Sequence, residues 1–286
     1  MPLSCIRIES DFEKGNRNML IDFHTHIFPE KIAARTVDVL KNNIVVRQGY
    51  LVENHTDATL PDLERSMSEQ QVDYSVVLPI ATKPSQTPTI NRYAKEVTKE
   101  NIISFGSLHP LQEDAPEVLK QLKEDGFVGI KLHPEYQGVY FDGPETIKIL
   151  QKAEELGLYV LLHAGEDIGI EPPIHATPER IRHTLDYVSG KYIIAAHMGG
   201  WGMWDDVEKY LVGTEIFMDT AYVKDYLGKE QCKRIIEHHG ADKILFGSDS
   251  PWEEPSATLA YLESLELTEE DLQKIKYKNA CKILSL

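Results

Sequence analysis

The stretch LIDFHTH, at residues 20–26, ends a short apolar run with two histidines one residue apart. A run of this kind is typical of a buried strand. Alternate side chains of a strand share one face, so His24 and His26 point to the same side, together with Asp22. Taken alone, the pair is equally compatible with the edge of a metal site and with a polar strand end that carries imidazoles.

Apolar runs of the same kind recur along the chain and alternate with helix-like segments. The eight strand candidates are residues 19–24, 73–80, 101–108, 127–133, 158–163, 191–197, 215–220 and 243–249. Strands that alternate with helices indicate a parallel sheet, and eight such units indicate a (β/α)8 TIM barrel of the α/β class. An open doubly wound sheet fits less well, because no early strand is followed by a G-x-G-x-x-G turn.

The predicted barrel is a single domain over residues 19–286, with an insertion at about residues 29–59, after the first strand. Residues 1–18 are polar and lack the apolar core of a signal peptide, so we expect a flexible N-terminal extension. Met19, where the first strand begins, is a candidate for the natural start.

Composition limits the partners and the compartment. The 286 residues carry a formal net charge of −16, which disfavours binding to nucleic acid and to anionic membranes. The three cysteines form no C-x-x-C motif, and no apolar run is long enough to span a bilayer. We therefore expect a cytoplasmic protein that acts on a small molecule, and a homo-oligomer is compatible with the sequence.

Side chains that can bind metal or transfer protons stand at the carboxyl ends of the predicted strands, where barrel enzymes place their chemistry. These residues are His24, His26, Lys131, His133, His163, His197 and Asp249. The outer face of each strand must be apolar because it packs on helices, which turns Ile21 and Phe23 outward and the histidines inward. The same alternation turns Lys131 and His133 inward.

Imidazole and carboxylate are the ligands of catalytic zinc, and His24, His26, His163 and Asp249 form such a set. Zn²⁺ is the favoured ion, with Mn²⁺ and Fe²⁺ as alternatives. A bound ion would activate water, with Asp249 as its base and His197 as an acid–base group.

Lys131 fits three roles equally well: a ligand after carboxylation, a substrate anchor, or a salt-bridged structural lysine. His133 fits substrate binding or structural support better than metal ligation. Trp201 and Trp252 follow the sixth and eighth strands and are candidates for the pocket wall.

The motifs DFHTH, LLHAGE, AAHMGG and FGSDSPW, at the ends of strands one, five, six and eight, resemble those of the amidohydrolase superfamily. The resemblance is closest to the branch that includes the aminocarboxymuconate-semialdehyde decarboxylase-like proteins. It implies a metal-dependent barrel in which His24, His26, His163 and Asp249 bind the ion and His197 is catalytic. In binuclear members the sixth-strand histidine binds a second ion, and a carboxylated lysine or a glutamate on strand four bridges the two ions. Because Lys131 stands on strand four, the resemblance is compatible with either one or two bound ions.

Three functions follow from this pattern. The leading expectation is a metal-dependent hydrolase that attacks an amide, cyclic amide, lactone or ester with activated water. The alternative is a metal-dependent non-oxidative decarboxylase of a small carboxylic acid, with His197 or Asp249 transferring the proton. A catalytically silent barrel that binds a ligand is the minor alternative.

Overall fold

The computed structural model describes residues 19–286, so the predicted extension over residues 1–18 lies outside the described residues. The described strands are β1 (Ile21–Thr25), β2 (Tyr74–Val77), β3 (Ile102–Ser104), β4 (Gly106–Ser107), β5 (Gly129–Leu132), β6 (Tyr159–Leu162), β7 (Ile193–Ala195), β8 (Phe217–Asp219) and β9 (Ile244–Leu245). Each of the eight predicted runs overlaps one of these strands, and the third run overlaps both β3 and β4.

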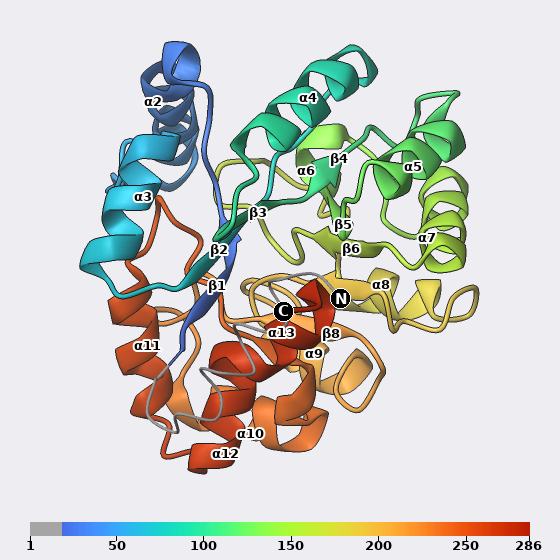
Figure 1. The fold of residues 1–286 in the computed structure, drawn as a ribbon. Coiled ribbons are helices and arrows are strands. Elements are labelled where there is room, and N and C mark those ends of the chain that lie inside the picture. Colours follow the sequence, from blue (N-terminus) through green and yellow to red (C-terminus); the bar gives the residue numbers. More distant parts are fainter. Residues whose placement is uncertain (1–18) are drawn as a thin grey trace.

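All strand pairs are parallel and follow chain order, in two sheets of order β1-β2-β3 and β4-β5-β6-β7-β8-β9. The sheets join through Phe105, between β3 and β4, whose amide donates to the carbonyl of Val77 at 2.9 Å. They close where the amide of Phe23 in β1 donates to the carbonyl of Phe246, just after β9, at 2.8 Å. The predicted TIM barrel is therefore confirmed (Figure 1).

Helices alternate with the strands and surround the barrel (Figure 1). They are α2 (Glu30–Gln48), α3 (Leu60–Glu69), α4 (Thr87–Val97), α5 (Ala115–Glu124), α6 (Pro134–Gln137), α7 (Pro144–Leu156), α8 (Pro178–Thr184), α9 (Trp204–Tyr210), α10 (Lys229–His239), α11 (Pro255–Glu263), α12 (Glu269–Gln273) and α13 (Asn279–Leu284). Thr177 caps α8 as its position predicted, since its hydroxyl accepts from the amide of Arg180. Over residues 19–286, no helix is both long and apolar enough to cross a membrane.

The insertion after β1 contains the 19-residue helix α2, which the sequence analysis did not predict. Its apolar residues are spread around the helix instead of forming one stripe. Val37 and Ile44 are buried against the protein, whereas Val39 and Val46 are 51% and 78% exposed. Without a one-sided apolar pattern, the periodicity that identifies a surface helix is missing.

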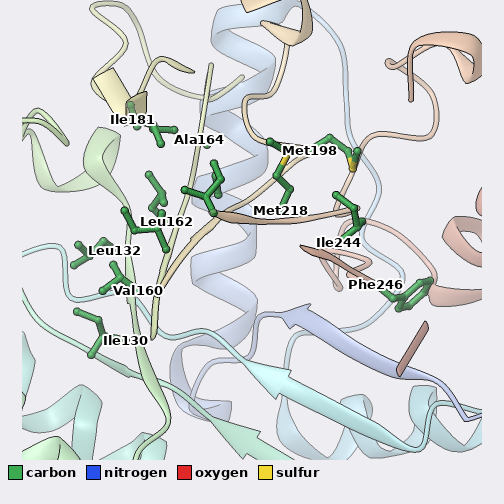
Figure 2. Close-up of a cluster of buried hydrophobic side chains, with 14 of the residues drawn as sticks. Ile130, Leu132, Val160, Leu162, Ala164, Ile181, Met198, Met218, Ile244 and Phe246 are labelled. Carbon is green, nitrogen blue, oxygen red and sulfur yellow. The ribbon is translucent and has the colours of Figure 1, made fainter. Parts of the chain in front are cut away.

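The apolar core has two layers. The helix-facing layer is shown in part in Figure 2 and includes Ile130, Leu132, Val160, Leu162, Met218 and Ile244. A separate interior cluster contains the alternate strand residues Val76, Leu161, Ile194 and Leu245, together with Phe105. Residues of the last helix, α13, pack into this interior cluster as well.

Ile21 and Phe23 belong to the interior cluster, so their predicted outward orientation is wrong. The Phe23 ring packs edge-on against Phe105, with ring centroids 5.7 Å apart. Strict alternation fails because the register of β1 against β2 shifts between Asp22 and Thr25. The shift lets the apolar residues fill the barrel and still directs the histidines that follow into the site.

Candidate active site

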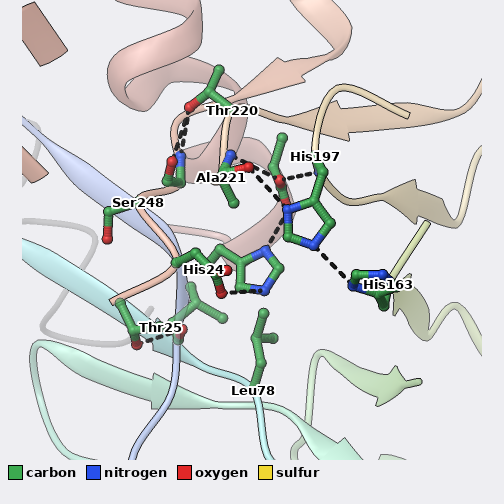
Figure 3. Close-up of polar contacts among 12 residues, drawn as sticks. His24, Thr25, Leu78, His163, His197, Thr220, Ala221 and Ser248 are labelled. Carbon is green, nitrogen blue, oxygen red and sulfur yellow. Dashed lines mark hydrogen bonds and ion pairs between the residues drawn. The ribbon is translucent and has the colours of Figure 1, made fainter. Parts of the chain in front are cut away.

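The side chains predicted for the site all line one pocket. They are His24, His26, Lys131, His133, His163, His197, Trp201, Asp249 and Trp252. His24 and Lys131 lie within β1 and β5, and the others follow the carboxyl ends of their strands. Part of this arrangement is shown in Figure 3. The barrel thus gathers residues that are far apart in sequence, as the strand-end argument predicted.

The first group, His24, His26 and Asp249, brings three electron-pair donors together. The Nε2 atoms of the two imidazoles are 3.2 Å apart, and Asp249 Oδ1 lies 3.4 and 3.2 Å from them. Each imidazole donates its Nδ1 proton elsewhere: His24 to Asp219 at 2.8 Å and His26 to the carbonyl of Leu78 at 2.9 Å. Both Nε2 atoms therefore carry lone pairs that face each other and a carboxylate, an arrangement that fits a divalent cation.

The charge state of His24 suits a metal ligand. Burial lowers the pKa of His24 well below its usual value, and the nearby Lys131 ammonium lowers it further. The imidazole therefore stays neutral, which is the form that binds metal.

Lys131 is a buried cation beside this group. Its Nζ atom lies 3.2 Å from His24 Nε2, and the residue is 1% exposed. Burial lowers its pKa to about 8, although Asp219 and Asp249 raise it. Among the described residues, no carboxylate oxygen comes within ion-pair distance of this ammonium. The salt-bridged structural role is therefore the least suited of the three roles that the sequence left open.

His163 and His197 present a second pair of facing lone pairs. His197 donates from Nδ1 to the carbonyl of Ala221 at 2.9 Å, and His163 donates from Nε2 to that of Glu166 at 3.2 Å. The remaining nitrogens, His197 Nε2 and His163 Nδ1, are 3.0 Å apart (Figure 3). The His197 ring also lies 5.3 Å from that of His24, so the two pairs are neighbours.

The backbone is strained at Asp249 and His197, the two residues predicted to be catalytic. Their φ angles are 70° and 59°, in the left-handed region that non-glycine residues rarely adopt. The strain is held by hydrogen bonds: Asp249 donates its amide to the carbonyl of His24, and His197 donates its amide to Asp219 Oδ1, both at 2.9 Å. Strain of this kind is concentrated at functional sites, where it fixes a side chain in position.

Sequence reasoning missed Asp219, which holds the amide of His197 and the ring of His24 with its two carboxylate oxygens. The predicted seventh strand ends at Thr220, which hides the position of Asp219 one residue earlier. Asp22 also supports His24 through the backbone. It accepts from the amide of His24 at 3.2 Å and binds the amide of Ser248 at 2.9 Å.

A second group, His133, His163 and Asp167, has the same composition but a different geometry. The two imidazole rings are stacked, with centroids 4.4 Å apart and planes 12° apart. The amide of Tyr136 donates to His133 Nδ1 at 3.4 Å, which leaves the His133 proton on Nε2, 3.4 Å from Asp167 Oδ2. These residues therefore form a hydrogen-bonded pair beside a stacked ring, without converging lone pairs. The sequence analysis did not single out Asp167.

The pocket walls are mostly apolar and aromatic. Besides the polar residues above, they include Phe28, Leu40, Ile44, Val52, Ile80, Ile168, Trp201, Tyr222 and Trp252. Leu40 and Ile44 come from α2, so the insertion forms one wall. The predicted wall residue Trp201 is held by a hydrogen bond from its indole to the carbonyl of Tyr222 at 3.2 Å. Such walls suit a planar, largely apolar ligand with a few polar groups.

Several solved structures share this fold. A 2,6-dihydroxybenzoate decarboxylase has a TM-score of 0.69 and 16% identity, covering 94% of this chain and 100% of its own. A dihydroxybenzoic acid decarboxylase from Polaromonas sp. JS666, solved with manganese and 2-nitroresorcinol, has a TM-score of 0.67 and 18% identity, with coverages of 94% and 98%. A 5-carboxyvanillate decarboxylase from Novosphingobium aromaticivorans DSM 12444, also with manganese, has a TM-score of 0.69 and 15% identity, with coverages of 96% and 98%.

These comparisons correct the leading functional expectation. The strand-end motifs favour a hydrolase, whereas several of the similar structures are decarboxylases. The hydrolase prediction is therefore wrong, and the decarboxylase alternative is favoured. The error has a physical source, because an inward His-His-Asp set indicates a metal but does not distinguish activated water from a bound carboxylate.

Two findings concern the sequence itself. No curated protein matches the chain. A family model described as "Amidohydrolase" matches residues 21–286, which is the whole barrel. This match agrees with the resemblance found in the strand-end motifs and with the fold. The chain belongs to the amidohydrolase family.

Proposed function

We propose that this protein is a metal-dependent, non-oxidative decarboxylase of a small ring-containing carboxylic acid. The observation that carries the proposal is Lys131, a buried ammonium in an apolar pocket, next to His24, with no carboxylate partner among residues 19–286. A buried cation with no carboxylate in direct contact is costly, so the pocket favours an anionic ligand. The names of the structurally similar decarboxylases support the same class of substrate.

The residues that would hold the ion are His24, His26 and Asp249, with His163 as a fourth ligand. Their facing lone pairs and the neutral state of His24 are the observations that favour metal binding. When bound, a divalent ion would supply positive charge for the substrate's carboxylate and a neighbouring oxygen. Imidazole and carboxylate ligands suit Zn²⁺, Mn²⁺ and Fe²⁺, and the manganese in two similar structures makes Mn²⁺ as good a candidate as Zn²⁺.

The chain's own side chains would divide the work. Lys131 binds the carboxylate through a charge-assisted hydrogen bond, and the apolar walls orient the ring and exclude water. In the reaction the bond between the ring carbon and the carboxylate breaks, CO₂ leaves, and the ring carbon takes up one proton. Asp249 and His197 both line the pocket, one with a carboxylate and the other with a free Nε2 lone pair, so either would take up a proton from solvent and pass it to the ring carbon.

The test is an assay of the purified protein, loaded with Mn²⁺ or Zn²⁺, against hydroxybenzoates, lactones and cyclic amides. We expect CO₂ release from at least one hydroxybenzoate and no hydrolysis of the lactones or cyclic amides. Absence of CO₂ release from every acid, with tight binding of the same acids, would support the silent barrel instead.

Lys131→Met is the sharpest variant for this proposal. We expect kcat/KM to fall about 10- to 100-fold, the size of one charge-assisted hydrogen bond, with the bound metal retained. Lys276→Met is the matched control, because Lys276 is also buried, 6% exposed, but does not line the pocket. If Lys131→Met left kcat/KM unchanged, Lys131 would have no role in substrate binding.

A further inference from the structure

Two residues of the second group, His133 and Asp167, line the pocket but have no role in the chemistry described above. We propose that Asp167, positioned by His133 and Tyr136, accepts a hydrogen bond from a hydroxyl or amino group on the substrate ring and excludes a second carboxylate. The inference rests on the proposed decarboxylase function and names the substrate class of that site: ring monocarboxylates with a hydrogen-bond donor substituent.

The hydrogen bonds of Asp167 leave room for one more donor. Its Oδ1 atom accepts from the amide of Gly169 at 2.7 Å, and Oδ2 lies 3.4 Å from His133 Nε2, which carries a proton. The hydroxyl of Tyr136 also bonds to this carboxylate, and burial raises the pKa of Tyr136 well above its usual value, so it remains a donor. A carboxylate has about four lone-pair positions, so three donors leave one position for a ligand.

The charges of the pocket disfavour a second acidic group. Over the described residues, Lys131 is the only lysine or arginine that lines the pocket, and Glu166, Asp167 and Asp249 line it as acids. Arg47 does not line the pocket: its Nη1 atom donates to the carbonyls of Asp167 and Ile170, and its Nε atom lies 3.9 Å from Glu171 Oε1. A second carboxylate would therefore meet acidic or apolar walls and lose its hydration without gaining a partner.

The same contacts hold Asp167 in position. Arg47 and Gln48 lie at the end of α2, and the Gln48 amide donates to the carbonyl of Ile168 at 3.2 Å. The loop that carries Asp167 is therefore tied to the inserted helix at three carbonyls, while Gly169 fixes one carboxylate oxygen. An acceptor fixed in this way loses little entropy when a ligand binds, which is a requirement for discrimination between substrates.

The test compares substrates that differ at one ring position. The probes are 2-hydroxybenzoates that carry hydrogen, hydroxyl, amino or a second carboxylate at each other ring position in turn, assayed by CO₂ release with the metal-loaded enzyme. At one position we expect hydroxyl or amino to raise kcat/KM about 10- to 100-fold over hydrogen, and carboxylate to lower it. In Asp167→Asn, both preferences should shrink at least about tenfold.

Glu171→Gln is the control, because it removes one negative charge from the same loop at a side chain that is 79% exposed and outside the pocket. Each preference is the ratio of two kcat/KM values measured on the same variant. A partial loss of folded enzyme lowers both values equally and leaves the ratio unchanged. For a variant without turnover, calorimetric binding of the nitro analogues, in which a nitro group replaces the reacting carboxylate, gives the same ratio.

The outcomes separate the two proposals. No CO₂ release from any acid would contradict the decarboxylase itself. CO₂ release with the same substituent preferences in wild type and Asp167→Asn would contradict only the role of Asp167. Two ions per chain in the wild type and one in Asp167→Asn would also overturn it, because the second group would then bind metal.

Discussion

Two groups in the pocket each contain two histidines and one aspartate, yet they are built for different tasks. In the first, His24 and His26 turn their Nδ1 protons away and direct two lone pairs toward Asp249. In the second, the rings of His133 and His163 are stacked, and a proton lies between His133 and its carboxylate. The difference lies at Nδ1: in His24 and His26 this nitrogen donates to an oxygen, whereas in His133 it accepts from a backbone amide.

The comparison teaches that residue composition does not define a metal site. Both sets have ligand atoms within 4.8 Å of one another. Only in the first set does the surrounding chain hold the protons of both rings away from the centre; in the second, His133 keeps its proton on the nitrogen that faces Asp167. The Asp219 carboxylate in β8 and the Leu78 carbonyl after β2 hold these protons, so the proposed metal site would depend on residues that do not touch the ion.

The largest expected effect comes from breaking the first group. His24→Ala should abolish metal binding and lower CO₂ release at least about 1000-fold, because several kcal/mol of charge stabilisation are lost. Metal content by mass spectrometry and turnover with a hydroxybenzoate are the measurements. His133→Ala is the matched variant in the second group and should keep one ion per chain. Equal metal loss in both variants would erase the distinction between the groups.

A smaller effect is expected when the orientation of His24 is loosened. Asp219→Asn should weaken metal affinity about 10- to 100-fold, because the amide no longer fixes the proton on Nδ1. Competition with a chelator measures this affinity. Asp22→Asn is the control, since Asp22 is equally buried but bonds the His24 amide and Ser248 rather than the ring. If both variants lost affinity equally, carboxylate burial and not ring orientation would explain the effect.

The smallest effect concerns His239, a buried histidine outside both groups. Its Nε2 donates to the carbonyl of Ile216 at 2.9 Å, and burial lowers its pKa below the usual value of 6.5. The folded state thus favours the neutral ring: its stabilisation is complete above pH 6.5 and is lost as the pH falls through the lower, folded pKa. His239→Gln should cost about 1 kcal/mol of unfolding free energy at pH 7.5 and less at pH 5. Urea unfolding at both pH values measures this, and a cost that grew at pH 5 would contradict it.

Much of the fold could be predicted because each strand is a short apolar run, and several of these runs end in a histidine, lysine or aspartate. The predicted inward direction of His24 and His26 was correct although the argument for it failed at Ile21 and Phe23. Strand periodicity assumes an uninterrupted ladder, and the register shift after Asp22 breaks that assumption. Such shifts depend on the neighbouring strand, which a local pattern does not contain.

The site was predicted where residues stand at strand ends and missed where they stand elsewhere. Asp167 lies in the loop after β6, and its position depends on contacts with Arg47, 120 residues earlier. The helix α2 was missed because its outward face is also apolar. The reaction could not be read from the ligand set either, since the same ligands serve hydrolysis and decarboxylation.

The closure of the barrel determines when the site can form during synthesis. The paired strands are neighbours in the chain, and β1 pairs with β2 in the same way. The other edge of β1 can be paired only by the segment that follows β9, where the Asp249 amide donates to the carbonyl of His24. A chain synthesised only as far as β9 has both histidines of the first group but no Asp249. Products truncated before Asp249 are therefore unable to assemble the complete site.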